Sequence, residues 1–208
     1  MLYTQSMNSN ASKPIGRPRI FDEETVLETI LQQFWRHGYE ATTLAHLTAA
    51  TGLHKGSLYQ AFGDKKTLFI KSLNHYLNKE YLQVLEQLLQ LPRGLDQLRK
   101  LLHIMIEFAT SDSDYNCGCM AVNTLVELAP HDPEILQVLE DAFAKRKQTV
   151  AEMIRAAQVQ GQIKQTMAPE AAAQLVCTMI AGLSTSLKGI LDEQQAHQVV
   201  EDFLSTLA

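Results

Sequence analysis

The segment from Phe34 to Phe69, FWRHGYEATTLAHLTAATGLHKGSLYQAFGDKKTLF, constrains the fold of this chain more than any other. It is typical of two short helices joined by a sharp turn at Gly52, because glycine adopts backbone conformations that other residues avoid. Thr42 or Thr43 is well placed to cap the first of these helices. A helix-turn-helix of this kind presents its second helix to the major groove of DNA. The segment therefore predicts a small helical domain that binds double-stranded DNA.

The second helix of the motif has one apolar side and one polar side. Leu58 and Phe62 lie four residues apart and are expected to anchor the helix to the core. The remaining positions are small or polar and can reach phosphates or base edges: Lys55, Gly56, Ser57, Tyr59 and Gln60. Gly56 costs about 1 kcal/mol relative to alanine inside a helix. Close approach to DNA explains that glycine better than packing does.

Four neighbouring residues extend the predicted DNA-binding surface. Thr42 and Thr43 begin a helix whose free N–H groups and dipole favour a phosphate, although capping is their ordinary role. His54 directly precedes the recognition helix. Lys65 occupies the first turn of the following helix, where a cation is unfavourable unless a phosphate lies nearby.

A basic arm precedes the motif. Arg17 and Arg19, in GRPR at residues 16–19, are suited to insertion into a narrow minor groove. Residues 1–75 hold eight Lys or Arg against six Asp or Glu, whereas residues 76–208 hold ten against seventeen. This asymmetry agrees with a molecule whose front end faces phosphate.

The chain as a whole predicts an all-α fold in three parts. Residues 1–15 are expected to form a disordered tail, residues 16–66 a three-helix DNA-binding domain, and residues 67–208 a helical rear domain. The first helix should begin at Asp22 and end at Gly38. The fourth should run from Asp64 to about Leu91, a length of about 42 Å that would connect the two domains. Further helices are expected at about 95–110, 119–129, 133–160, 169–190 and 194–206.

Composition argues against several classes of protein. The sequence has no apolar run of membrane-spanning length, and its first residues lack the apolar core of a secretory signal. Three cysteines are too few for a disulfide framework, so a cytoplasmic protein is expected. Cys117 and Cys119 lack the usual zinc spacing, so a metal site shared with Cys177 or His131 is disfavoured, and neither a metal nor a cofactor is predicted.

Residues 16–75 resemble the TetR family of bacterial transcriptional regulators. The resemblance lies in GRPRIFDEETVLETIL and in the run that follows it, where the glycine, the paired threonines, Gly52, KGSLYQAF and the next lysine fall in register. The later segment GCMAVNTLVELAPHDPEI is similar to the corresponding region of some members. The resemblance implies a homodimer that binds a palindromic DNA operator and usually represses transcription. It also implies a small-molecule effector in the rear domain that swings the two DNA-reading heads apart.

An effector pocket needs a few polar groups on apolar walls. The candidate lining residues are His103 and Phe108 on the helix at 95–110, Cys119 and Asn123 on the next helix, and Phe143. Apolar stripes at this spacing are more often core than pocket, and His103 is equally consistent with a core histidine. Both interpretations stay open from sequence.

Three alternatives concern function, and one concerns assembly. A thiolate at a helix N-terminus has a lowered pKa, so Cys119 also suggests a redox- or electrophile-sensing regulator. A helical enzyme is less expected, because no nucleophile–base, phosphate-loop or H-E-x-x-H motif is found, and a protein-binding adaptor ranks third. The apolar faces of the helices at 169–190 and 194–206 predict a four-helix dimer interface, unless they pack within one monomer.

Overall fold

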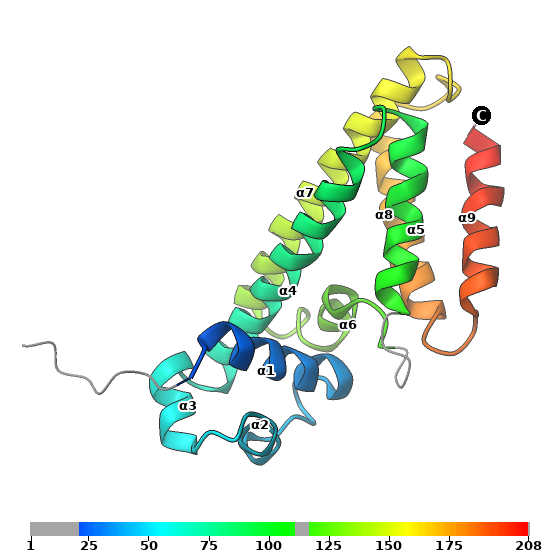
Figure 1. Cartoon of the computed structure of the whole chain (residues 1–208). Helices are drawn as coiled ribbons and strands as arrows, with labels where there is room; N and C mark the ends of the chain where they lie inside the picture. Colours follow the sequence, from blue (N-terminus) through cyan, green and yellow to red (C-terminus); the bar gives the residue numbers. More distant parts are fainter. Residues whose placement is uncertain (1–20, 111–116, 208) are drawn as a thin grey trace, which may run out of the picture.

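The computed structural model describes residues 21–110 and 117–207, and all regular secondary structure in these two ranges is helical. The predicted all-α class is therefore confirmed. Figure 1 shows a small cluster of short helices at one end of an elongated bundle. The described residues form α1 (Glu23–His37), α2 (Leu44–Thr51), α3 (Lys55–Phe62), α4 (Lys65–Leu88), α5 (Leu95–Ala109), α6 (Met120–Glu127), α7 (Pro133–Val159), α8 (Pro169–Ser186) and α9 (Glu193–Leu207).

The first three helices and the start of α4 share one apolar core. Phe34 of α1 and Phe69 of α4 meet edge to face with ring centroids 5.0 Å apart, a favourable aromatic geometry. Leu47 of α2 and Leu58 of α3 are fully buried against them. The predicted ends of α1 are confirmed, since Asp22 accepts a hydrogen bond from the Thr25 amide and Gly38 has a φ of 78°.

The helix α4 runs from the short front helices into the rear bundle (Figure 1). The Asp64 carboxylate caps its first turn by accepting from the Thr67 amide at 2.8 Å. The helix ends at Leu88, one turn before the predicted end at about Leu91. Pro92 disfavours helical backbone at the residue before it, and the Gln97 side-chain amide donates to the carbonyl oxygens of Leu88 and Leu91.

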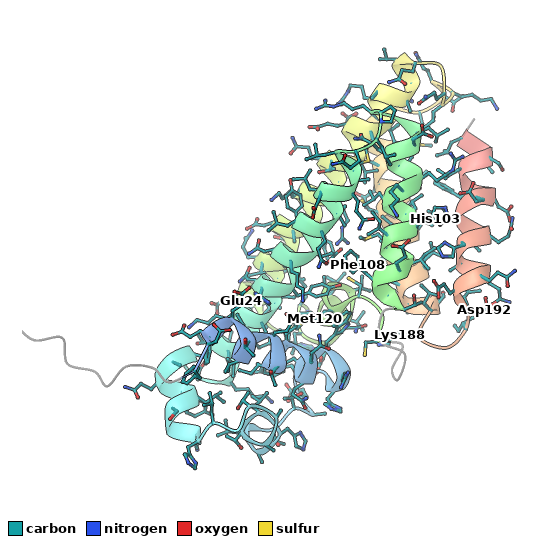
Figure 2. The ribbon with its side chains drawn as sticks, in the orientation of Figure 1. Glu24, His103, Phe108, Met120, Lys188 and Asp192 are labelled. Atoms are coloured by element: carbon teal, nitrogen blue, oxygen red, sulfur yellow. The ribbon has the colours of Figure 1, made fainter. Side chains whose placement is uncertain are left out.

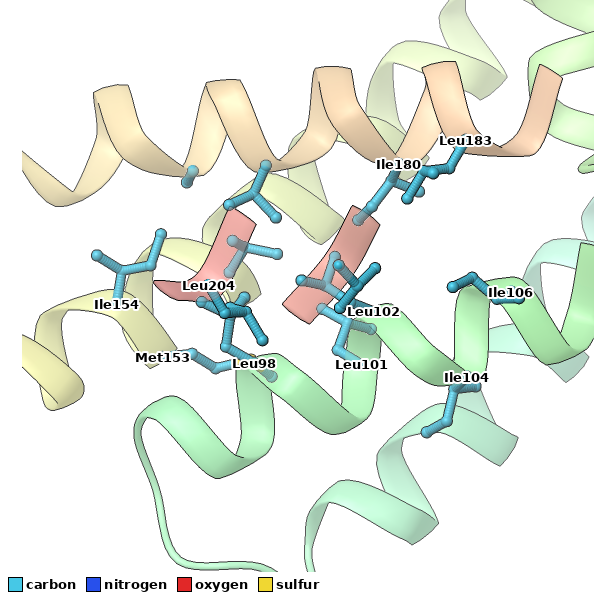
Figure 3. Packing of buried hydrophobic residues seen from close by; sticks show 14 of the residues in the cluster. Leu98, Leu101, Leu102, Ile104, Ile106, Met153, Ile154, Ile180, Leu183 and Leu204 are labelled. Carbon is cyan, nitrogen blue, oxygen red and sulfur yellow. The ribbon is translucent and has the colours of Figure 1, made fainter. Parts of the chain in front are cut away.

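The rear bundle is built from α5, α7, α8 and α9, with the distal part of α4 against it. Figure 3 shows part of its core, to which α5 contributes Leu98 and Leu102, and α8 contributes Ile180 and Leu183. Ile154 of α7 belongs to the same cluster, and these residues are all less than a tenth exposed. Burial on this scale makes the bundle the larger of the two sources of hydrophobic stabilisation.

Much of the apolar surface of α8 and α9 is used within the subunit. Ile180 and Leu183 of α8 and Leu204 of α9 are buried in the rear core. Leu175 and Val199 are different, because they stay 52% and 39% exposed. Part of the apolar surface that was predicted to form the dimer interface is therefore buried inside one subunit. Only the outward-facing residues of α8 and α9 remain available to another chain.

The front core extends past the short helices into the rear of the sequence. Met120 and Ala121 of α6 and Ile135 and Leu139 of α7 are buried in the same cluster as α1 to α4. The predicted domain boundary between residues 66 and 67 stays a prediction, since α4 contributes to both cores. No helix in the described ranges is both long and apolar enough to cross a membrane.

Candidate functional site

The helix α3 presents a polar face at the end of the molecule. Leu58 and Phe62 are 0% and 3% exposed and hold the helix on the front core. The opposite face carries side chains that are exposed or, for Tyr59, half-buried: Lys55, Gly56, Ser57, Tyr59 and Gln60. Gly52, with φ 68° and ψ 5°, provides the sharp turn from α2. The predicted division of α3 into two sides is confirmed, while contact of its polar face with DNA stays a prediction.

The start of α2 distinguishes the two threonines. The Thr43 hydroxyl accepts from the His46 amide at 3.2 Å, and the His46 ring accepts from the Thr43 amide at 3.3 Å, which is a reciprocal cap. Thr42 is fully buried, and its hydroxyl donates to the Gly38 carbonyl at 2.6 Å. The prediction that Thr42 contacts DNA is therefore wrong, because its side chain closes the turn after α1 and cannot reach a phosphate.

The remaining predicted DNA contacts lie around α3. His54 is exposed and directly precedes α3 without making a side-chain cap. The Lys65 ammonium lies 4.3 Å from the centroid of the Tyr39 ring and 3.5 Å from the Glu40 carbonyl oxygen. This cation–π contact accounts for a lysine at a helix N-terminus without a phosphate. Arg17 and Arg19 lie outside the described residues.

Several contacts join the front helices to α6 and its flanking residues. The Trp35 indole donates to the Gly118 carbonyl at 2.9 Å. The Glu127 carboxylate accepts from the backbone amides of Tyr39 and Glu40 at 3.1 and 2.9 Å. Gly118 lies just before α6 and Glu127 is its last residue, so both ends of α6 are attached to α1 and the loop after it. The front helices are therefore joined to the rear of the molecule by α6 as well as by α4.

A salt bridge at the start of α4 adds to these contacts between the front helices and the rear of the molecule, which we call the junction. The Lys66 ammonium lies 2.8 Å from the Asp132 carboxylate and 2.9 Å from that of Glu134, at the start of α7. Hydrogen bonds to these two acids raise the pKa of Lys66. Lys66 thus points toward α7 and is bound there, whereas Lys65 lies over the loop between α1 and α2.

Cys119 sits inside this junction and does not have the environment of a reactive thiolate. The Tyr76 hydroxyl donates to its sulfur at 3.4 Å, and its amide donates to the Ser184 hydroxyl at 2.8 Å. Burial raises the pKa of the Cys119 thiol, and the nearby Glu80 carboxylate raises it further. The alternative of a reactive Cys119 thiolate is therefore not supported, because desolvation outweighs the position of Cys119 at the start of α6.

A cavity of about 280 Å³ lies between α4, α5 and α7. Most of its wall is apolar and includes Leu77, Val84, Leu88, Leu101 and Met105. A glutamate and an arginine stand in the same wall, paired through Glu80 Oε1 and Arg146 Nη2 at 2.5 Å. Burial raises the pKa of Glu80, while the Arg146 charge opposes that shift. The site combines an apolar chamber with a buried ion pair, which suits a small organic ligand.

Two family models match the chain. One, described as bacterial regulatory proteins of the tetR family, matches residues 26–71. The other, described as the tetracyclin repressor-like C-terminal domain, matches residues 94–203, more than half of the chain. The chain belongs to the TetR family. As a member, it is a DNA-binding transcriptional regulator.

Individual relatives agree with this assignment. The transcriptional repressor ComR of Escherichia coli is 28% identical over 176 residues, which are 85% of this chain and 84% of ComR. YezE of Bacillus subtilis, an uncharacterized HTH-type regulator, is 31% identical over 136 residues, 62% of this chain and 70% of YezE. A cysteine mutant of the TetR-family regulator CifR, solved with a 26-bp double-stranded operator, superposes with a TM-score of 0.81 at 28% identity, covering 93% of this chain and 100% of CifR.

The five predicted pocket residues of this TetR-family chain do not converge on one cavity. His103 of α5 faces α9, where its ring nitrogens lie 2.5 Å from His197 and 2.8 Å from Glu201 (Figure 2). Phe108 lines a shallow depression beside Ile104. The others are separated as well, because Asn123 lies between α1 and α8, Phe143 between α7 and α8, and Cys119 in the junction with α4. The structure does not bring these five residues together around one cavity, and a role of each in ligand binding stays a prediction.

Sequence reasoning missed the residues that shape the cavity and the junction. Glu80 had a readable signal, because it follows Leu73 and Tyr76 and precedes Val84 at the spacing of one buried helix face. A carboxylate at such a position predicts a buried partner. Glu127 had no comparable signal, because its partners are backbone amides 87 and 88 residues away.

Proposed function

We propose that this chain is a repressor that binds a palindromic operator as a homodimer and is released by a small-molecule effector. The observation that carries the DNA-binding part is the face of α3, where small and polar side chains point outward while Leu58 and Phe62 hold the helix on the core. A helix anchored in this way enters a major groove without disturbing its own domain. The DNA-bound CifR neighbour supports the same use of the fold.

The outer faces of α8 and α9 are the proposed dimer interface. Leu175 and Val199 are 52% and 39% exposed although both are large and apolar. Two helices from each of two subunits would form a four-helix bundle around a twofold axis. Such an axis places two copies of α3 on one side of a duplex, and each would contact one half of a palindrome.

The cavity between α4, α5 and α7 is the proposed effector site. It lies beside the distal half of α4, and the proximal half of the same helix packs against α1 and α3. A ligand that changes the packing of α4 in the rear therefore has a direct route to α3. In this proposal, residues 16–66 form the DNA-binding domain, and residues 67–208 form the effector-binding and dimerisation domain.

Binding to labelled DNA from around its own gene tests the repressor proposal. The full chain is titrated against this DNA and against unrelated DNA of equal length at two salt concentrations. Specific binding should exceed binding to the unrelated duplex by about a thousandfold or more, and both should weaken steeply as salt rises. Equal affinity for the two DNAs would refute the proposal. Light scattering on the same sample tests the dimer, which a monomer at micromolar concentration would contradict.

A further inference from the structure

The loop between α1 and α2 is held by a carboxylate from α6. Oε2 of Glu127 accepts from the Tyr39 amide at 3.1 Å, and Oε1 accepts from the Glu40 amide at 2.9 Å. Hydrogen bonds to an ionised acceptor are stronger than those between neutral groups. Because the two donors belong to successive residues, this pair of bonds fixes the direction of the loop as well as its distance from α6.

The contact depends on a close fit between Glu127 and the loop. Glu127 is the last residue of α6, where the negative end of the helix dipole disfavours an anion. On the other side, a β-carbon built on Gly38 would lie 2.9 Å from Oε2 of Glu127, so the carboxylate takes this position because residue 38 has no side chain. The two loop amides offset the unfavourable place of the carboxylate at the end of its own helix.

The loop leads directly into the two helices of the helix-turn-helix. Thr43 caps α2 immediately after it, and Gly52 then turns the chain into α3. Other contacts of the junction act elsewhere, since Trp35 holds α1 and Lys66 holds the start of α4. Glu127 thus acts on the backbone just before α2, at a point that neither Trp35 nor Lys66 reaches.

We propose that Glu127 is a positioning residue for operator binding, which keeps α2 and α3 in one orientation relative to the rear bundle. It acts through the loop and not by contact with DNA. This inference rests on the proposed homodimer, in which the two heads contact both halves of a palindrome only when both have that orientation. A head without the Glu127 contact still binds one half of the palindrome, because a single head needs no fixed relation to the rear bundle.

The expected effect follows from how often both heads are correctly oriented. If a head without the contact keeps its bound orientation about a third of the time, both heads have it together about a tenth of the time. The apparent affinity for the whole palindrome then falls about tenfold, since it scales with the population of the binding-competent state. The affinity for one half of the palindrome stays the same.

The test compares the binding of the full chain to two labelled duplexes by fluorescence anisotropy. One is the DNA from around its own gene that the wild type binds specifically, and the other is the same duplex with one half of the palindrome scrambled. The wild type should bind the intact duplex at least about a hundredfold more tightly, because a second linked contact raises the overall affinity. Glu127→Ala should reduce this ratio about tenfold and Glu127→Gln about threefold, since the carboxamide oxygen keeps one of the two hydrogen bonds.

The matched control removes a carboxylate that lies outside the junction. Glu152 is exposed on α7 and accepts from Gln148 of the same helix, so Glu152→Ala should keep the wild-type ratio. Circular dichroism and thermal denaturation follow the folding of each variant. If Glu127→Ala does not fold, the ratio measured for Glu127→Gln decides.

Two results would overturn the role of Glu127. One is a ratio that stays at the wild-type value in the folded Glu127 variants. The other is an equal loss of affinity for both duplexes, which is the result expected of a head that is only less well folded. A wild type that binds the two duplexes equally would contradict the proposed homodimer and this inference together, whereas a wild-type preference that the variants retain contradicts the role of Glu127 alone.

Discussion

Two substitutions of Gly56 should separate its effect on stability from its effect on DNA binding. A β-carbon built on Gly56 meets no atom within 4 Å, and the backbone there is ordinary helix, so alanine fits without strain. Gly56→Ala should raise the free energy of unfolding by up to about 1 kcal/mol, since glycine is a poor helix former. For a chain of this size, the melting temperature should rise by about 2–4 °C at most.

A larger side chain at the same place should block the operator. Gly56→Leu projects into the space between α3 and the DNA, where overpacking costs about 1–3 kcal/mol per site. A twofold dimer meets this cost twice, so operator affinity should fall at least about 30-fold. The assay is fluorescence anisotropy with labelled operator, beside thermal denaturation of each variant.

The control adds a leucine far from the DNA. Gln148 is exposed on α7, outside the proposed DNA-binding and dimer surfaces, so Gln148→Leu should keep wild-type operator affinity. If Gly56→Leu binds the operator as tightly as the wild type, α3 does not approach DNA through this face. If Gly56→Ala lowers the melting temperature, the open space above Gly56 has been misjudged.

Three further predictions concern burial, charge and assembly. Thr42→Val keeps the shape of a buried side chain but removes its hydroxyl, and urea denaturation should show a loss of about 1–3 kcal/mol in the free energy of unfolding. Unchanged stability would contradict the role of that hydroxyl in closing the turn after α1. Lys66 holds the pKa of Asp132 below its usual value, so this contact stabilises the fold above about pH 4 and its contribution is lost as the pH falls further. Lys66→Met should therefore lose less stability on acidification than the wild type. Parallel curves of unfolding free energy against pH for the two proteins would argue against this coupling. Leu175→Glu should give monomers in light scattering whereas Val159→Glu, also on an exposed apolar residue, should not; dimers of both would place the interface elsewhere.

The parts of the fold that were predicted from sequence depend on local signals. Asp22 and Asp64 cap α1 and α4 through amides three residues away, and Gly52 turns the chain by its own backbone conformation. Each of these contacts is decided within a few residues, so the sequence contains all the information needed to place them. The two sides of α3 follow in the same way from the spacing of Leu58 and Phe62.

The parts that were missed depend on how helices cross. Helical spacing shows that His103 and Phe108 lie on α5, but not that His103 meets His197 on α9, 94 residues away. Thr42 and Thr43 are adjacent and chemically identical, and only the path of the chain after α1 decides which hydroxyl is buried. The cavity between α4, α5 and α7 could not be predicted for the same reason, because its walls come from three helices whose crossing angles no local pattern encodes.

The glycine before α6 has a consequence for how two subunits would share one operator. Gly118 has a φ of 66°, and a β-carbon there would lie 2.8 Å from the Ser184 carbonyl oxygen of α8. Its own carbonyl meanwhile receives the Trp35 indole of α1. The reading head of each subunit thus rests, through one residue without a side chain, directly on a helix that borders the proposed twofold axis. In such a dimer, the packing of Gly118 against α8 would help to set the distance between the two DNA-binding heads. A residue larger than glycine at this position would change that distance, and with it the spacing of the operator half-sites that the dimer can bind.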